Sequence, residues 1–142
     1  MGSEHPNIGF KVVLPYMEIE VVAEGIVRFD LTRDTVIDME KSIEMFEICK
    51  KLYPNSAYKS LKIVKHKMKL EPDVMDFLAS DARKGLISFE AVVVESTTLK
   101  MLGNFYLKIK KPVIKTKIFD NENQALVWLK SQTEAQQSMK MI

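Results

Sequence analysis

Residues 87–95 read Ile-Ser-Phe-Glu-Ala-Val-Val-Val-Glu, and this stretch decides the fold class of the chain. It contains four consecutive apolar residues, Ala91 to Val94, so neither face of an extended segment is left for water. A short β-branched run of this kind is typical of a strand that is covered on both faces of a parallel sheet. We therefore expect a central buried strand at this position.

Helical and extended patterns alternate on both sides of this strand. Pro72 and Gly85 suit the first turn and the end of a helix before it, and Asp120 or Asn121 can cap a helix after it. The expected helices are 35–52, with start signals in 32–34, then 72–84, 98–109 and one after 121; the other strands are 61–64 and 113–119. Alternation of this kind indicates an α/β fold with a mostly parallel sheet.

The N-terminal third has a different pattern. Strand-like segments at 10–14 and 17–22 are separated by Pro15, and a tight turn at Glu24-Gly25 leads into 26–31. This arrangement predicts a β-hairpin before the first helix. We expect a single domain over 10–131 with four or five main strands and four helices, and loose termini at 1–9 and 132–142.

Two helices have apolar patterns that bear on function. In the first, an apolar stripe of Val36, Met39, Ile43, Phe46 and Cys49 is expected to face the core, with Cys49 as a small core residue. In the third, the apolar residues are too many for one narrow stripe. Either part of that helix faces a partner, a second copy or a lipophilic ligand, or the hairpin or the C-terminal tail covers it.

The charges are unevenly distributed along the 142 residues. Residues 1–58 have a net charge of −4, residues 59–117 of +7 and residues 118–142 of −1. A basic region can attract nucleic acid or anionic lipid, can pair with the acidic third of a second copy, or can simply be a solvated surface. Because no aromatic residues are interleaved with the lysines in a recognition pattern, we do not expect nucleic acid as a partner.

Catalytic groupings are not evident in the sequence. One Cys and two His argue against a disulfide scaffold, a four-thiolate zinc site and imidazole chemistry. Glu90 with Glu95, or Asp73 with Asp76, could form an acid–base pair, but nothing marks a cleft around them. We therefore expect no catalytic, cofactor or metal site, and a role other than that of an enzyme.

Targeting signals are also not evident. The first 25 residues lack a basic segment followed by an apolar run of 7–15 residues, and no window approaches 18 uninterrupted apolar residues. We expect a cytoplasmic protein with no integral membrane segment, and the single Cys suits a reducing compartment.

Several segments resemble a known family. The stretches Ala91–Ser96, Leu102–Ile109, Ile118–Asp120 and Ala125–Leu129, together with Pro112, are similar to those of small bacterial proteins of the STAS superfamily, in particular the STAS/SEC14-like branch. The resemblance implies an anti-anti-sigma-factor-like fold. It also implies partner switching by phosphorylation of a serine at the start of the second helix. The corresponding stretch here, 65–73, contains no Ser or Thr, so that phosphorylation site is not carried over.

The resemblance and the lack of catalytic groupings point first to a regulatory or protein-interaction module that forms a homodimer or binds a protein partner. The alternative is a SEC14-like binder or carrier of a small lipophilic molecule, which would need a cavity under the third helix. Lys65, Lys67, Lys69 and His66 could bind an anionic group near the second helix or be a solvated loop. The expected partner or ligand surface consists of Lys67, Lys69, Asp73, Asp76, Leu99, Met101, Leu102, Phe105 and Tyr106.

Overall fold

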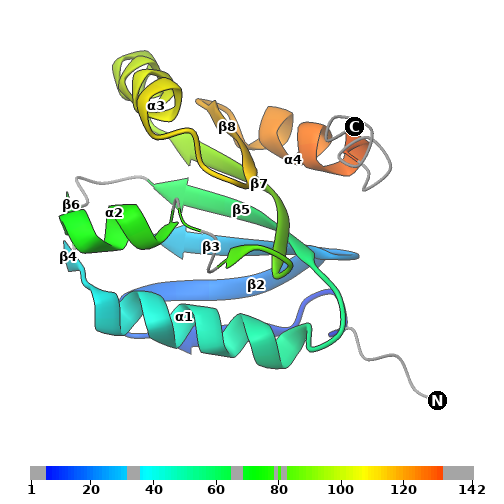
Figure 1. Ribbon diagram of the computed structural model, residues 1–142. Coiled ribbons are helices and arrows are strands. Elements are labelled where there is room, and N and C mark those ends of the chain that lie inside the picture. The colour runs from blue at the N-terminus through cyan, green and yellow to red at the C-terminus, as the bar shows by residue number, and fades with distance from the viewer. Residues whose placement is uncertain (1–5, 32–35, 65–68, 79, 81–82, 133–142) are drawn as a thin grey trace.

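A computed structural model of the protein describes residues 6–31, 36–64, 69–78, 80 and 83–132 (Figure 1). The helices are α1 (Met39–Leu52), α2 (Pro72–Leu78), α3 (Thr97–Lys110) and α4 (Glu122–Ser131). The strands are β1 (Lys11–Leu14), β2 (Met17–Ala23), β3 (Ile26–Leu31), β4 (Val36–Ile37), β5 (Tyr58–Val64), β6 (Lys69–Leu70), β7 (Ile87–Val94) and β8 (Lys115–Phe119).

Six of these strands form one sheet in the order β1-β2-β3-β5-β7-β8. The first three are antiparallel, and the pairs from β3 to β8 are parallel. Strand β7 lies between β5 and β8, as residues 87–95 predict, and β4 pairs with β6 outside this sheet. The predicted α/β class, with an N-terminal hairpin and a mostly parallel sheet, is confirmed.

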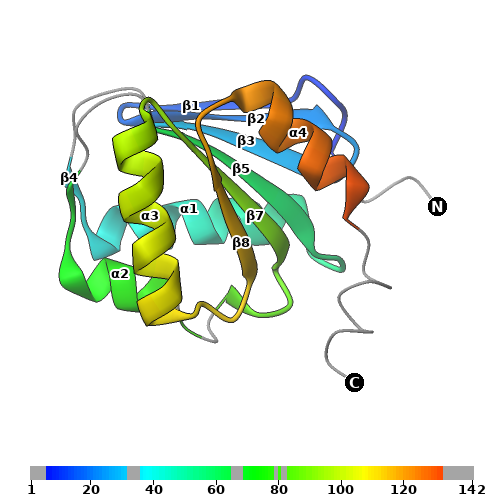
Figure 2. The same ribbon diagram turned by 90° about the horizontal axis from the view of Figure 1, so that it is seen from above.

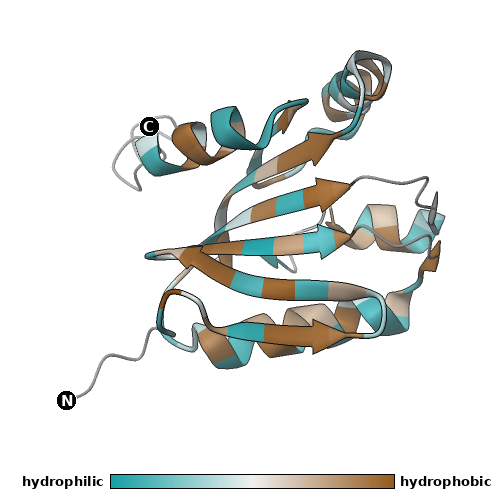
Figure 3. Cartoon of the chain, turned by 180° about the vertical axis from the view of Figure 1, so that it is seen from behind, coloured by the Kyte–Doolittle hydropathy of each residue, from teal (hydrophilic) through white to brown (hydrophobic). Residues whose placement is uncertain are grey.

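The two faces of the sheet are covered by different helices. Apolar and polar residues alternate along several strands, as the brown and teal segments of Figure 3 show, and successive side chains of a strand point to opposite faces. The face that includes Phe29 packs against α1 and α2, and the face that includes Leu61 and Phe89 packs against α4. Figure 2 shows α4 on one side of the sheet and α1 with α2 on the other. Helix α3 packs against the edge strand β8 and against β7.

Helix α1 begins later than the pattern predicts. Asp38 caps it by accepting a hydrogen bond of 2.9 Å from the Lys41 backbone N–H, and Val36 belongs to strand β4 instead. The buried face of α1 is also turned relative to the expected stripe, because Ile43 is 45% exposed whereas Ser42 is buried with Cys49. The stripe was therefore wrong at Val36 and Ile43 and right at Cys49. The start signals at 32–34 lie outside the described residues.

Helix α3 also differs from its expected packing. Ser96 caps it, but although α3 is described along its whole length, none of its residues is buried. Tyr106 faces inward together with Gly103 and Leu107, whereas the other apolar residues at helical spacing, Leu99, Leu102, Phe105 and Ile109, are exposed. The described part of α2 ends at Leu78, short of the predicted residue 84. None of the helices in the described ranges has the length and apolar character needed to cross a membrane.

Candidate functional site

A cavity of about 280 Å³ lies between α3 and the sheet face that α1 and α2 cover. Strands β3, β5, β7 and β8 contribute to its walls together with the three helices. Most of the lining is apolar, and it includes Leu31, Met45, Val64, Val92, Leu107 and Ile118. The cavity is thus positioned where the alternative reading of the sequence requires one, beneath the third helix.

Strand periodicity determines which side chains line this cavity. Lys62 and Val64 of β5, and Glu90 and Val92 of β7, are at even-numbered positions and line it. The odd-numbered neighbours on these strands, such as Ala91, belong to the core under α4. Because successive side chains on a strand point to opposite faces, the even-numbered positions deliver two charged residues to the same apolar space.

Glycine in α3 sets the distance between this helix and the sheet. A Cβ atom at Gly103 would lie 3.2 Å from Cγ1 of Ile118, closer than ordinary van der Waals contact. The helix therefore approaches β8 most closely at Gly103, and Tyr106 and Leu107 on the next turn line the cavity. A single exposed ion pair, of 3.3 Å between Lys110 and Asp76, links the end of α3 to α2 within the described residues.

A buried charged cluster lines the same cavity. The Glu90 carboxylate accepts hydrogen bonds from both terminal nitrogens of Arg83, at 3.1 and 2.7 Å, and from the Ser60 hydroxyl at 2.9 Å. The Lys62 ammonium nitrogen lies 3.1 Å from Oε2 of the same carboxylate. The side chains of Lys62, Arg83 and Glu90 are only 12%, 5% and 6% exposed. Two buried cations thus share one carboxylate.

The pKa values within this cluster reflect a competition between burial and charge. Burial favours the neutral form of Glu90, but the charges of Arg83 and Lys62 outweigh it and hold the pKa of this carboxyl well below its ordinary value. Burial lowers the pKa of Lys62, and the attraction of Glu90 does not fully restore it because Arg83 repels the ammonium. Of the three charged groups, Lys62 is therefore the one whose ionised form is disfavoured in the folded protein.

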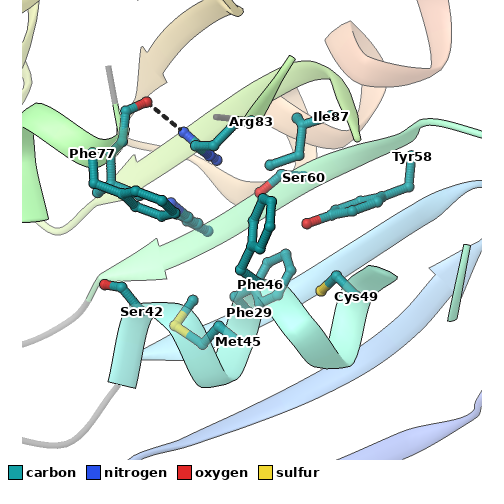
Figure 4. Close-up of a pocket in the computed structure, with 12 residues that line it drawn as sticks. Phe29, Ser42, Met45, Phe46, Cys49, Tyr58, Ser60, Phe77, Arg83 and Ile87 are labelled. Atoms are coloured by element: carbon teal, nitrogen blue, oxygen red, sulfur yellow. Dashed lines mark hydrogen bonds between the residues drawn. The ribbon is translucent and has the colours of Figure 1, made fainter. Parts of the chain in front are cut away.

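A smaller pocket of about 30 Å³ adjoins the cavity (Figure 4). Ser42 and Cys49 of α1 face Tyr58 and Ser60 of β5 across it, and the dashed line marks the 2.9 Å bond from Arg83 to the Leu78 carbonyl. Burial raises the pKa of the Cys49 thiol to about 11, which suits a core residue and not a nucleophile. Five residues line both spaces, namely Ser42, Met45, Lys62, Leu78 and Arg83.

The predicted surface residues divide into three groups. Leu99, Met101, Leu102, Phe105 and Ile109, of which the first four were predicted, are 43–68% exposed and form what we call the outer face of α3. Tyr106 lines the cavity, and Asp76 forms an ion pair with Lys110. Asp73 is exposed and accepts a hydrogen bond from the Val74 backbone N–H, Lys69 is in β6, and Lys65, His66 and Lys67 lie outside the described residues.

Sequence reasoning missed the charged cluster. Lys62 and Glu90 each interrupt an apolar strand, and a charged residue at a core position needs a partner of opposite charge. That signal was present in the sequence, but the pairing of the two strands and the return of Arg83 to them were not. Within the described ranges, no group of three or more His, Cys, Asp or Glu residues could hold a metal ion.

Comparisons with known proteins agree with the fold. The chain is similar to a crystal structure of an uncharacterized protein of the DUF3478 family, with a SpoIIAA-like fold, from Shewanella loihica PV-4. The TM-score is 0.54 at 10% identity, and the match covers 90% of this chain and 99% of the other. This similarity confirms the STAS-like fold. At 10% identity it concerns the fold alone.

Sequence comparisons are more limited. No curated protein matches the chain. A family profile, described as a domain of unknown function, DUF7793, matches residues 18–133, which include all of β2 except Met17, the strands from β3 to β8 and helices α1 to α4. The chain belongs to the DUF7793 family.

Proposed function

We propose that this chain is a non-catalytic STAS-like binding module that holds a small lipophilic molecule in the cavity beneath α3. The observation that carries the proposal is the cavity, about 280 Å³ in volume and lined mainly by apolar side chains. Its volume is near the lower end of the range for small-molecule sites, roughly 300–1,000 Å³.

The packing of α3 supports entry of a ligand. None of its residues is buried, and the residues that line the cavity, Gly103, Tyr106 and Leu107, are only partly covered. The Lys110–Asp76 ion pair that links it to α2 is exposed and contributes about 0–1 kcal/mol. Segments with few buried contacts open at low free-energy cost, and α3 can therefore act as the moving cover of the site.

The test is a substitution that fills the cavity. Val92→Phe enlarges a side chain on the cavity floor, and Val127→Phe makes the same change on the exposed surface of α4, on the other side of the sheet. Equilibrium dialysis with 1-octanol and with octanoate measures binding by the wild type and both variants. We expect the wild type and Val127→Phe to bind at least one probe, and Val92→Phe to bind it at least tenfold more weakly.

Two results contradict the proposal. One is that neither probe binds the wild type. The other is that Val92→Phe binds as tightly as the wild type while its circular dichroism and melting temperature show that it is folded. Because cavity filling is normally neutral or stabilising, a folded variant is expected.

The outer face of α3 favours a second candidate function, self-association of the chain. Five large apolar side chains are exposed on one helix there, and contiguous apolar patches commonly mark interaction sites. A second copy could cover this face by packing its own α3 against it, since a two-fold interface uses the same patch on both subunits. The regulatory or interaction role implied by the STAS-like fold would then depend on this surface.

A further inference from the structure

The charged cluster at the floor of the cavity has more positive than negative charge. Lys62 and Arg83 are both ionised cations in water at neutral pH, and Glu90 is the one carboxylate among the described residues that line the cavity. Burial of an uncompensated charge is costly, because the low-dielectric interior cannot replace its hydration. An anion placed beside Lys62 would remove this excess.

A cationic ligand would have to compete with two protein cations at the same place. Each oxygen of the Glu90 carboxylate accepts from Arg83, and Oε2 also accepts from Ser60 and lies against Lys62. Oε2 thus has three contacts and Oε1 has one, and both cations of the cluster are already paired with this single carboxylate. The cluster therefore favours an anion over a second cation in the space above it.

Donors remain available to an anion. An ammonium group has three N–H bonds, and the structure gives that of Lys62 one partner among the described residues, Glu90. The Ser42 hydroxyl lines both the cavity and the smaller pocket, as do Lys62 and Arg83. Because these three side chains line both spaces, they lie where the cavity and the smaller pocket adjoin.

We propose, on the basis of the ligand-binding function above, that the natural ligand is a lipophilic carboxylate whose head binds at the Lys62–Arg83–Ser42 junction and whose apolar chain lies under α3. A volume of about 280 Å³ lies near the lower end of the range for small-molecule sites, roughly 300–1,000 Å³. This corresponds to a medium-chain or small aromatic acid, and not to a two-chain phospholipid. The depressed pKa of Lys62 agrees with a site that lacks one negative charge.

The experiment compares three probes of matched chain length, octanoate, 1-octanol and octylammonium, by equilibrium dialysis at neutral pH. It uses the wild type and two variants, Lys62→Met and Lys130→Met. Lys62→Met removes the excess cation and leaves the Arg83–Glu90 pair in place, whereas Lys130 is exposed on α4 and provides the matched control. Unfolding midpoints of all three proteins verify that they fold.

We expect octanoate to bind the wild type and Lys130→Met at least tenfold more tightly than 1-octanol, and octylammonium to bind most weakly. Lys62→Met should lose at least tenfold in octanoate affinity and retain its affinity for 1-octanol. Equal binding of octanoate and 1-octanol, or an unchanged octanoate affinity in Lys62→Met, overturns the carboxylate proposal and leaves the binding function standing. Failure of all three probes overturns both.

Discussion

Arg83 and Glu90 form a two-point ion pair, with hydrogen bonds of 3.1 and 2.7 Å, in which both side chains are almost completely buried. The pair fastens the segment that precedes β7 to the middle of that strand. Arg83 also donates to the Leu78 carbonyl at the end of α2, so one guanidinium connects a helix end to the sheet. The floor of the cavity is therefore fixed by charge as well as by packing.

Removing the negative member of this cluster should be strongly destabilising. Glu90→Gln leaves Arg83 and Lys62 buried without an anion, and loss of one partner from a buried pair typically costs about 3–5 kcal/mol. Urea unfolding measures this change in the free energy of unfolding. Glu95→Gln, just beyond β7 and exposed, is the matched control and should be within about 0.5 kcal/mol of the wild type. A loss below about 1 kcal/mol in Glu90→Gln would show that the cations are not buried as described.

Removing one cation should instead increase the free energy of unfolding. Lys62→Met eliminates the charge whose pKa burial lowers, and keeps an apolar side chain of similar length. Because the unfolded chain takes up the Lys62 proton more readily than the folded protein does, raising the pH through the interval below 10.5 stabilises the wild type. The variant should thus be more stable than the wild type at neutral pH, with a difference that narrows as the pH approaches 10.5.

Urea midpoints of both proteins at about pH 7 and about pH 10 check this dependence. Groups that titrate in this range and do not interact with Lys62 are present in both proteins and cancel in the difference. A gap that is constant with pH, or that widens, would mean that Lys62 is ionised at no cost in the folded state.

The sequence predicts the sheet better than the site because the two depend on different information. Strand β7 and the hairpin turn at Gly25, where φ is +72°, follow from local patterns of apolar residues and from turn chemistry. The charged cluster depends on Lys62 and Glu90 lying on neighbouring parallel strands and on Arg83 returning to them, which are contacts between distant segments. The local sequence patterns show that Lys62 and Glu90 are charged, but they do not show that these residues pair with each other and with Arg83.

Helix α3 illustrates the same limit in a different way. Its apolar residues are too many for one face, and their pattern does not say which of them turn toward the sheet. The face turned to the sheet is the one that bears Gly103, since only a residue without a side chain permits the close approach to Ile118. Most of the larger apolar residues are exposed. Packing against β8 thus decided the orientation of the helix.

Substitutions at Gly103 test this approach. Gly103→Ala gains about 1 kcal/mol of helix propensity and loses a comparable amount, because Ile118 must move by a few tenths of an ångström, so stability should change by less than about 0.5 kcal/mol. Gly103→Leu should cost about 1–3 kcal/mol through overpacking. Asn104→Leu, exposed on the same helix, is the control and should be close to neutral. If the two leucine variants are equally stable in thermal unfolding, α3 is not held against β8 at Gly103.

The Cys49 thiol should be protected in the folded protein. Burial raises its pKa from 9.0 to about 11, which makes the thiolate about a hundredfold rarer at pH 8, and the side chain is 1% exposed. Reaction with dithiobis(nitrobenzoic acid) at pH 8 should therefore be more than a hundredfold slower in buffer than in denaturing urea. Similar rates in the two conditions would show that α1 does not cover this residue.

Self-association through α3 makes a prediction that is independent of the cavity. Phe105→Glu places a charge at the centre of the outer face of α3, where Phe105 is 63% exposed and supports no core contact, so the fold should be retained. Burying that carboxylate against a second copy would be costly, and the variant should sediment as a monomer at concentrations where the wild type forms dimers. Asn104→Glu, next to it and already polar, should sediment like the wild type. If the wild type and Phe105→Glu sediment alike while circular dichroism shows both folded, the outer face of α3 does not mediate self-association.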